Sequence, residues 1–145
     1  MQLTLYTDYA IRTLIYLGTH PDRRITVGEI STSFGISRNH LTKVVQRLGQ
    51  LGYVNTVRGK HGGLELARHA GEVTLGEMVR LLEPFTLVEC FDTDRDTCPI
   101  TPACKVKGAL EKARQRFLSA LDEYTVADMV EEPRGLITLL AIGPR

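Results

Sequence analysis

Residues 37–67 read SRNHLTKVVQRLGQLGYVNTVRGKHGGLELA and combine a helix pattern with a hairpin pattern. Ser37 is a favourable N-cap residue, so the sequence predicts a helix over residues 38–51. The apolar stripe of this helix consists of Leu41, Val44, Val45, Leu48 and Leu51. Two short alternating runs follow, over 53–57 and 64–67, and the glycine-rich RGKHGG between them predicts a β-hairpin.

Two shorter helices are predicted before this stretch. Apolar residues recur at helical spacing over 5–19, and a His-Pro dipeptide ends that helix because proline disfavours helical backbone in the residue before it. Thr26 and Glu29 form a capping-box pattern that begins a helix over 27–34. Three short helices followed by a hairpin are the element order of a winged helix-turn-helix.

The second half, residues 71–145, is predicted as helices around a cysteine-bearing loop. A capping-box pattern begins a connecting helix over 75–83, the longest helix covers about 104–123, and the tail over 131–145 carries no clear pattern. An apolar seam follows the longest helix and consists of Val106, Leu110, Ala113, Phe117, Leu121 and Tyr124. An apolar seam of this length has to be buried against another surface. We expect that surface to belong to a partner subunit, and the alternative is that the helix packs on its own domain. The expected fold class is mainly α with a small β-hairpin wing: a winged helix-turn-helix over 1–70 plus a long C-terminal dimerisation helix.

Composition describes an ordinary globular chain. Hydrophobic residues make up 43% and charged residues 24% of the 145 residues, and no apolar run reaches the roughly 18 residues that a membrane span needs. The N-terminal apolar stretch carries Asp8 and Arg12, so it does not read as a signal peptide. We therefore expect a cytoplasmic protein with reduced thiols and no membrane partner. The sequence contains neither a nucleophile–base set nor a phosphate loop, and we do not expect an enzyme.

Charge divides the chain into unlike halves. Residues 1–70 hold nine Lys/Arg and four Asp/Glu, a net charge of +5, whereas residues 71–145 hold nine and thirteen, a net charge of −4. A polyanion is therefore the expected partner of the first half.

Candidate DNA contacts lie in this basic half, on the predicted third helix and at the hairpin tip. Such a helix can enter the major groove, and such a tip can place cations against phosphates or in the minor groove. The side chains suited to these contacts are Arg38, Asn39, Thr42, Lys43, Arg58, Lys60 and His61. A polar helix face alone is often merely solvated, but these features in this order indicate binding to double-stranded DNA.

A polar loop over residues 90–104 holds all the cysteines of the chain, at Cys90, Cys98 and Cys104. Thiolates are soft ligands for zinc, copper(I) or iron–sulfur clusters. Alternating aspartates imitate the start of a calcium loop, but Thr97 and Ala103 stand where that loop needs glycine and glutamate. Structural zinc sites usually include a close CxxC or HxxxH pair, which this loop lacks. Unligated thiols remain the alternative to an iron–sulfur site.

Three stretches resemble the BadM/Rrf-type winged-helix repressors: YTDYAIRTLIYL, the run ISRNHLTKVVQRLGQLGYVNTVRGKHGGLELAR, and LGEMVRLLE. The resemblance extends from about Leu3 to Val130. Within this family, the TDYAIR opening and the cysteine spacing are similar to the nitric-oxide-sensing NsrR branch. The IscR branch has a histidine ligand three residues after its last cysteine, where this sequence has Lys107.

The resemblance implies a homodimer crossed through the long helix, with one iron–sulfur cluster in each subunit. It implies that Cys90, Cys98 and Cys104 hold the cluster and that Asp8 of the other subunit completes the site. Arg12 lies one helical turn after Asp8, where it can form an ion pair with that carboxylate. A 4Fe–4S cluster is favoured, and a 2Fe–2S cluster is the alternative, because the cysteine spacing varies among relatives.

The function implied is a nitric-oxide-responsive transcriptional repressor that binds palindromic DNA as a homodimer and is released when its cluster reacts. One alternative is a regulator of the same family that responds to cluster status or redox state. Another is a DNA-binding regulator whose cysteines act as a metal-free thiol switch. An iron–sulfur enzyme or electron carrier would need a substrate pocket or a second redox site, which the sequence does not indicate.

Overall fold

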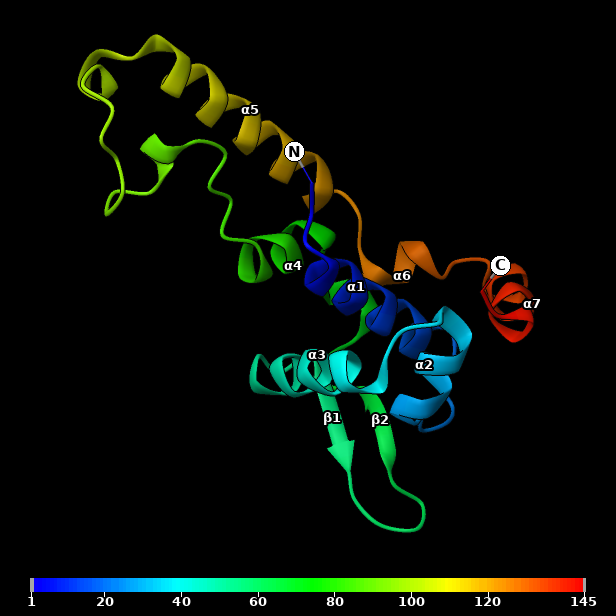
Figure 1. Cartoon of the computed structure of the whole chain (residues 1–145). Coiled ribbons are helices and arrows are strands. Elements are labelled where there is room, and N and C mark those ends of the chain that lie inside the picture. Colours follow the sequence, from blue (N-terminus) through cyan, green and yellow to red (C-terminus); the bar gives the residue numbers. More distant parts are fainter. Residues whose placement is uncertain (1, 145) are drawn as a thin grey trace.

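The computed structural model describes residues 2–144 of the chain. The first part contains α1 (Leu5–Gly18), α2 (Val27–Phe34), α3 (Arg38–Gln50), β1 (Val54–Val57) and β2 (Gly63–Leu66). The second part contains α4 (Leu75–Leu82), α5 (Lys105–Asp122), α6 (Val126–Met129) and α7 (Pro133–Ile142), with short 3-10 turns at Ala70–Glu72, Glu89–Phe91 and Thr101–Ala103. The expected fold class is confirmed: the chain is mostly helical with one antiparallel hairpin (Figure 1).

Local capping explains where the helices of the first part begin. The capping box between Thr26 and Glu29 is complete, with each side chain bonded to the backbone of the other residue. The Ser37 hydroxyl accepts from the backbone N–H of His40. Gly35 between α2 and α3 has φ of 66°, a left-handed conformation that glycine adopts without strain. The helix-turn-helix bounds therefore follow from local sequence.

The second predicted capping box forms only in part. The Thr74 hydroxyl accepts from the backbone N–H of Glu77. The Glu77 carboxylate instead accepts from the Tyr53 hydroxyl at 2.5 Å and from Arg68 at 3.0 Å. A tertiary contact has therefore replaced the local one, and it joins α4 to the start of the hairpin.

The hairpin forms the wing of the fold. Its strands pair from Val54 with Leu66 to Val57 with Gly63. Ile25, between α1 and α2, adds a bridge to Leu64 on the other side of β2. The wing and α3 lie at the same end of the molecule (Figure 1).

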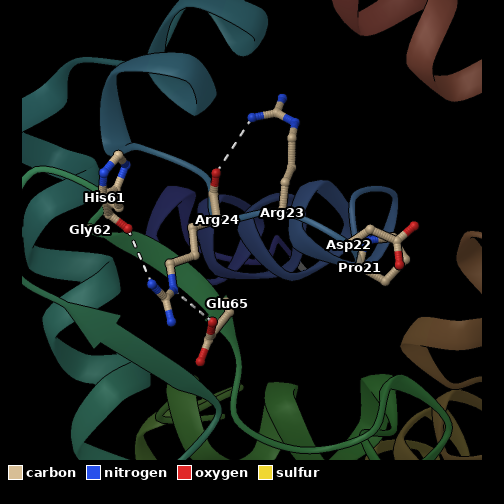
Figure 2. Close-up of a pocket in the computed structure, with 7 residues that line it drawn as sticks. All are labelled: Pro21, Asp22, Arg23, Arg24, His61, Gly62 and Glu65. Atoms are coloured by element: carbon tan, nitrogen blue, oxygen red, sulfur yellow. Dashed lines mark hydrogen bonds and ion pairs between the residues drawn. The ribbon is translucent and has the colours of Figure 1, made fainter.

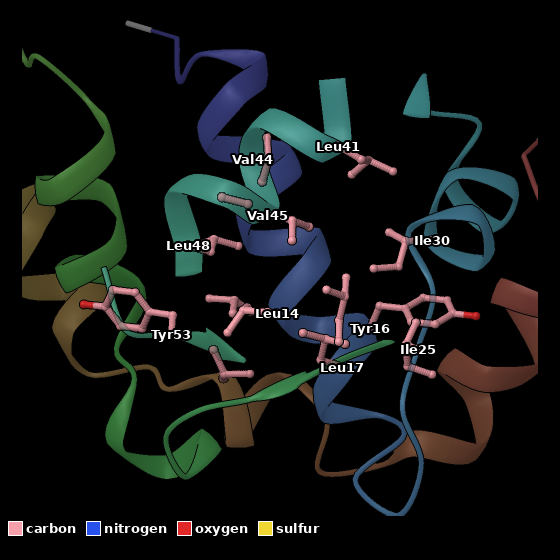
Figure 3. Close-up of a cluster of buried hydrophobic side chains, with 14 of the residues drawn as sticks. Leu14, Tyr16, Leu17, Ile25, Ile30, Leu41, Val44, Val45, Leu48 and Tyr53 are labelled. Carbon is pink, nitrogen blue, oxygen red and sulfur yellow. The ribbon is translucent and has the colours of Figure 1, made fainter. Parts of the chain in front are cut away.

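One hydrophobic core joins both parts of the chain. Side chains from α1, α2, α3 and the hairpin meet at its centre, as Figure 3 shows for Leu14, Ile30 and Leu48. Val73, Met78 and Val126, from the second part, belong to the same buried cluster. The two parts of the chain therefore share one core.

Helix α5 leaves this core as an arm, and the cysteine-bearing segment lies at its outer end (Figure 1). The buried side chain of α5 is Leu118, at 3% exposure, which the predicted seam did not include. Two predicted seam residues, Val106 and Tyr124, are 65% and 49% exposed in the single chain. Leu118 is buried because α4 packs on the end of α5 near the body. The expected cover of the seam by a partner subunit stays a prediction.

The tail contains a helix that the sequence pattern did not reveal. Helix α7 begins with Pro133 at its first position and packs against α2. Its Leu140 lies against the core, whereas Leu139 and Ile142 are exposed. Within residues 2–144, no helix combines the length and the apolar character that crossing a membrane requires.

Candidate nucleic-acid interface and cysteine loop

The exposed face of α3 carries the four predicted DNA-contacting residues of that helix. Arg38, Asn39, Thr42 and Lys43 are all exposed, whereas the opposite stripe, apart from its last residue, is buried. The Thr42 hydroxyl donates to the backbone oxygen of Arg38 at 2.8 Å. The Arg38 guanidinium lies beside Gly28, close enough that a Cβ at residue 28 would be 3.0 Å from it. Helix α3 therefore offers one cationic and polar face.

The wing tip carries the other three predicted residues. Arg58, Lys60 and His61 are exposed on the turn between the strands. Gly62 closes this turn by donating to the backbone oxygen of Gly59 at 2.9 Å. A Cβ at residue 62 would lie 2.3 Å from the backbone oxygen of Val57, so the tight turn requires glycine there. The tip thus presents its cations to solvent from a defined turn.

The cysteine loop holds three free, half-buried thiols. Cys90 lies in the 3-10 turn Glu89–Phe91, and Cys104 is the N-cap residue of α5. The Cys104 sulfur accepts from the backbone N–H of Lys107 at 3.5 Å. Cys90 and Cys104 both line a cavity of about 550 Å³, which Cys98 does not line.

Aspartates of the loop hold its turns. The Asp96 carboxylate accepts from the backbone N–H of Cys98 at 3.1 Å and from the Thr101 hydroxyl at 2.9 Å. The Asp92 carboxylate accepts from the backbone N–H of Asp94 at 3.1 Å. Across residues 2–144 of this one chain, no three His, Cys, Asp or Glu side chains are grouped closely enough to hold a metal ion.

Asp8 lies in the first turn of α1 and forms the predicted ion pair with Arg12. The Arg12 guanidinium bonds to both carboxylate oxygens, at 2.9 Å and 2.7 Å, and both side chains are about two-fifths exposed. The same guanidinium lies 5.7 Å from the centre of the Phe34 ring, at the end of α2. Arg12 thus links the Asp8 carboxylate to the helix-turn-helix, a connection that the sequence did not indicate.

The donor chemistry fits an iron–sulfur cluster. Thiolates are the usual ligands of such clusters, the three cysteines are free, and two of them share one cavity. The loop offers one soft ligand too few for four cysteines, so a further ligand has to come from elsewhere. Helix α1, which carries Asp8, lies in the body, whereas the loop of the same chain is at the outer end of the arm (Figure 1).

A contact between α4 and α1 was also missed by sequence reasoning. The Glu83 carboxylate accepts from the backbone N–H of Thr4 at 2.7 Å and from its hydroxyl at 2.8 Å. Partial burial opposes ionisation of Glu83, but its hydrogen bonds with Thr7 and Thr4 outweigh that effect and lower its pKa. The residues that precede the cysteine loop are therefore tied to the start of α1. A separation of 79 residues leaves no local signal for this contact.

Comparison with known proteins shows which family has this architecture. Residues 3–132 match the family model of Rrf2, described as iron-dependent transcriptional regulators. The structure of T. potens IscR is similar, with a TM-score of 0.74 and 23% identity over 91% of this chain and 88% of that chain. CymR of B. subtilis, described as the global cysteine regulator, gives 0.73 and 22% over 90% and 97%. The oxidized form of Staphylococcus aureus CymR gives 0.71 and 23% over 90% and 97%. The chain therefore belongs to the Rrf2 family, whose members are transcriptional regulators rather than enzymes.

Proposed function

We propose that this protein is a nitric-oxide-responsive transcriptional repressor that binds palindromic DNA as a homodimer, under the control of an iron–sulfur cluster. The observation that carries the proposal is the set of three free cysteines on one loop at the start of α5, two of them on one cavity. Free thiols on a polar, proline-containing loop are unusual as core residues and suitable as ligands.

The proposed ligands are Cys90, Cys98 and Cys104 of one subunit and Asp8 of the other. A 4Fe–4S cluster is favoured, with a 2Fe–2S cluster as the alternative. When bound, the cluster supplies iron with which nitric oxide reacts. The Cys104 sulfur already accepts a hydrogen bond at the N-terminus of α5, and a helix N-terminus favours negative charge such as that of a thiolate.

A homodimer would cover the apolar surface that the single chain leaves exposed. Val106 on the arm and Leu5 at the start of α1 are each 65% exposed. One lies at the outer end of the arm and the other in the body, and a partner subunit that covers both would bury apolar surface on each. A second copy that crosses its α5 over this one would also bring its cysteine loop toward α1 of this chain.

Arg12 supplies a route from the site to the DNA-binding helices. Its guanidinium contacts both the Asp8 carboxylate and the Phe34 ring of α2. A change in the partners of Asp8 therefore alters how Arg12 holds α2. An exposed ion pair contributes up to about 1 kcal/mol and an exposed cation–π contact about 0.5–1 kcal/mol. A tenfold change in DNA affinity requires about 1.4 kcal/mol, so these contacts are of sufficient size.

Anaerobic purification tests the sensing part of the proposal. The expected result is a brown dimer that contains iron and sulfide, loses its visible absorption with nitric oxide and then releases DNA. A colourless protein that takes up no iron on anaerobic reconstitution would contradict the proposal and favour the thiol switch. A loaded protein whose DNA affinity follows cluster content but ignores nitric oxide would favour the cluster-status regulator.

Lys43→Ala and Arg58→Ala test the DNA face. Each substitution should weaken binding and, for a phosphate contact, reduce the slope of log affinity against log salt by about one unit. Lys112→Ala, at an exposed position on the arm, is the matched control that removes a charge of the same sign. Unchanged affinity in both test variants would place the DNA face elsewhere.

A further inference from the structure

The wing is a small element, and its tip has to be held in a fixed position if it is to contact DNA without a cost of ordering. Its two strands pair over only four residues each, and a two-stranded hairpin is marginally stable by itself. Its cations, Arg58 and Lys60, and the neighbouring His61 are exposed beyond the paired region. A tip that moved freely would have to be ordered on binding DNA, at a cost in affinity.

Arg24, in the loop between α1 and α2, holds the wing at two points (Figure 2). Its Nη1 donates to the backbone oxygen of His61 at 3.2 Å, and its Nε donates to the Glu65 carboxylate at 3.1 Å. The first contact is at the tip and the second is on β2. Arg24 therefore spans the wing from its strand to its turn.

The backbone next to Arg24 strengthens this attachment. Ile25 and Leu64 exchange two backbone hydrogen bonds, at 3.0 Å and 2.7 Å. A Cβ at Gly63 would lie 3.0 Å from the Cβ of Arg24, so the segment lies directly against β2. Residues 24 and 25 are thus attached to β2 by one isolated bridge, between Ile25 and Leu64.

Arg23, the neighbouring residue, has a different environment. Its guanidinium forms an ion pair with Glu29 at 2.6 Å, at the start of α2, and it points away from Glu65 (Figure 2). Arg23 and Arg24 line the same open cavity of about 520 Å³. The two arginines therefore carry the same charge beside the same cavity, but of the two only Arg24 forms hydrogen bonds to the wing.

We infer that Arg24 is a positioning residue for DNA binding: it fixes the direction of the wing tip, and the tip residues make the contact. The inference rests on the proposed DNA face. The charge of Arg24 is already compensated by Glu65, and both of its donating nitrogens face the wing. Its effect on affinity is therefore expected to pass through Arg58 and Lys60.

The test measures binding of the full-length protein to a duplex that the unmodified protein selects from random-sequence DNA, across a range of salt concentrations. Arg24→Ala should reduce affinity about 3–10-fold, the cost of ordering one or two more residues, and leave the salt slope unchanged. Arg23→Ala, the matched control, should reduce it less. Arg24→Lys, which keeps the charge and can still reach Glu65, should recover part of the loss.

A double-mutant comparison separates positioning from direct contact. In a protein that already carries Arg58→Ala and Lys60→Ala, adding Arg24→Ala should cause no further loss of affinity. An additive loss with a salt slope lower by about one unit would identify Arg24 as a phosphate contact and overturn the inference.

The positioning role of Arg24 and the proposed DNA face can be refuted separately. If Arg58→Ala weakens binding while Arg24→Ala does not, the positioning role is wrong and the DNA face stands. If neither variant changes affinity, the wing is not part of the DNA face and the inference falls with it. Near-native thermal unfolding of each variant establishes that the comparison is between folded proteins.

Discussion

Among single residues, Cys98 differs from the other two cysteines in its surroundings. Cys90 and Cys104 line one cavity, whereas the backbone of Cys98 is held by Asp96, which also accepts from Thr101. The polar turn around Cys98 is thus stabilised by contacts of its own. Its thiol makes no contribution to the buried core.

Cys98→Ala is therefore expected to remove cluster binding while leaving a folded dimer. Iron and sulfide content after anaerobic purification should fall to background, and DNA binding should no longer respond to nitric oxide. The free energy of unfolding of the cluster-free variant should differ from that of the cluster-free parent by less than about 0.5 kcal/mol, because Cys98 lies outside the hydrophobic core. A Cys98→Ala protein that retained its response to nitric oxide would exclude Cys98 as a ligand.

Glu77 gives the fold a dependence on pH. Burial tends to raise its pKa, but hydrogen bonds from Tyr53 and Arg68 outweigh this and lower the pKa. Burial, together with the hydrogen bond to Glu77, raises the pKa of Tyr53 to about 12. Because the pKa of Glu77 is lowered on folding, its contribution to stability is present above the ordinary value of 4.5 and is lost as pH falls through the lowered value.

Glu77→Gln should consequently destabilise the protein at neutral pH and have less effect in acid. We expect a loss of about 1 kcal/mol in the free energy of unfolding at pH 7, discounted because the side chain is about one-third exposed. Urea unfolding at pH 7 and below pH 4 measures the difference. Glu131→Gln, at an exposed position, is the control. An equal loss at both pH values would show that the charge of Glu77 is not responsible.

At the scale of elements, the junction between α4 and α5 decides how the arm leaves the body. A Cβ at Gly76 would lie 2.8 Å from the backbone oxygen of Leu118 and 2.1 Å from Asp122. Arg80 pairs with the same Asp122 carboxylate, with one bond at 2.6 Å. The two helices therefore approach more closely than any residue but glycine allows, and the ion pair lies beside that contact.

Gly76→Ala should destabilise the protein by about 1–3 kcal/mol, because the added methyl group meets backbone that cannot move without shifting the helix. Chemical denaturation provides the measurement. Gly108→Ala is the matched control: it lies on α5 with no atom near the added Cβ, and it should stabilise by up to about 1 kcal/mol. Equal stability of the two variants would mean that the close approach of α4 and α5 carries no energetic weight.

At the scale of the whole molecule, the arm separates groups that the proposed site requires together. The cysteine loop lies at the outer end of α5, and α1 lies in the body (Figure 1). Within residues 2–144 of one chain, no metal-binding group of three side chains is assembled. A site made of the loop and Asp8 therefore belongs to the dimer, and this can be tested by mixing subunits.

Mixed dimers of Asp8→Ala and Cys98→Ala subunits should regain one complete site. The Asp8→Ala subunit supplies three cysteines, and the Cys98→Ala subunit supplies Asp8, so one of the two sites has every ligand. Co-expressed, differently tagged subunits should bind one chelator-resistant cluster per dimer. Neither parent homodimer should do so.

The mixed dimer also distinguishes an Asp8 ligand that comes from the other subunit from one that comes from the same chain. If Asp8 completed the site of its own subunit, both sites of the mixed dimer would lack a ligand, and the mixture would behave as the parents do. A loaded Asp8→Ala homodimer with an unchanged spectrum and unchanged resistance to chelator would show that Asp8 is not a ligand at all.

Local sequence was sufficient for the elements of the first part, for α4 and α5, and for the exposed DNA-binding candidates. Thr26, Ser37 and Gly35 define the helix-turn-helix because capping bonds and left-handed glycine act within a few residues. The three stretches quoted for the resemblance were sufficient for the family, which the match over residues 3–132 confirms. The narrower assignment to the nitric-oxide-sensing branch, from the cysteine spacing and the TDYAIR opening, stays a prediction. Periodicity also separated the buried stripe of α3 from its cationic face.

Contacts between distant segments came only from the folded chain. Leu118 is buried because α4 lies across the end of α5, which its own spacing did not indicate. Helix α7 begins at Pro133, and its N-cap residue Glu132 makes no side-chain hydrogen bond to the helix, so no capping pattern predicted it. Arg24 reaches His61 across 37 residues, and Arg12 reaches Phe34 of another helix. A side chain's spacing along its own helix or strand states which face it occupies, whereas its partner depends on which element the fold brings against that face.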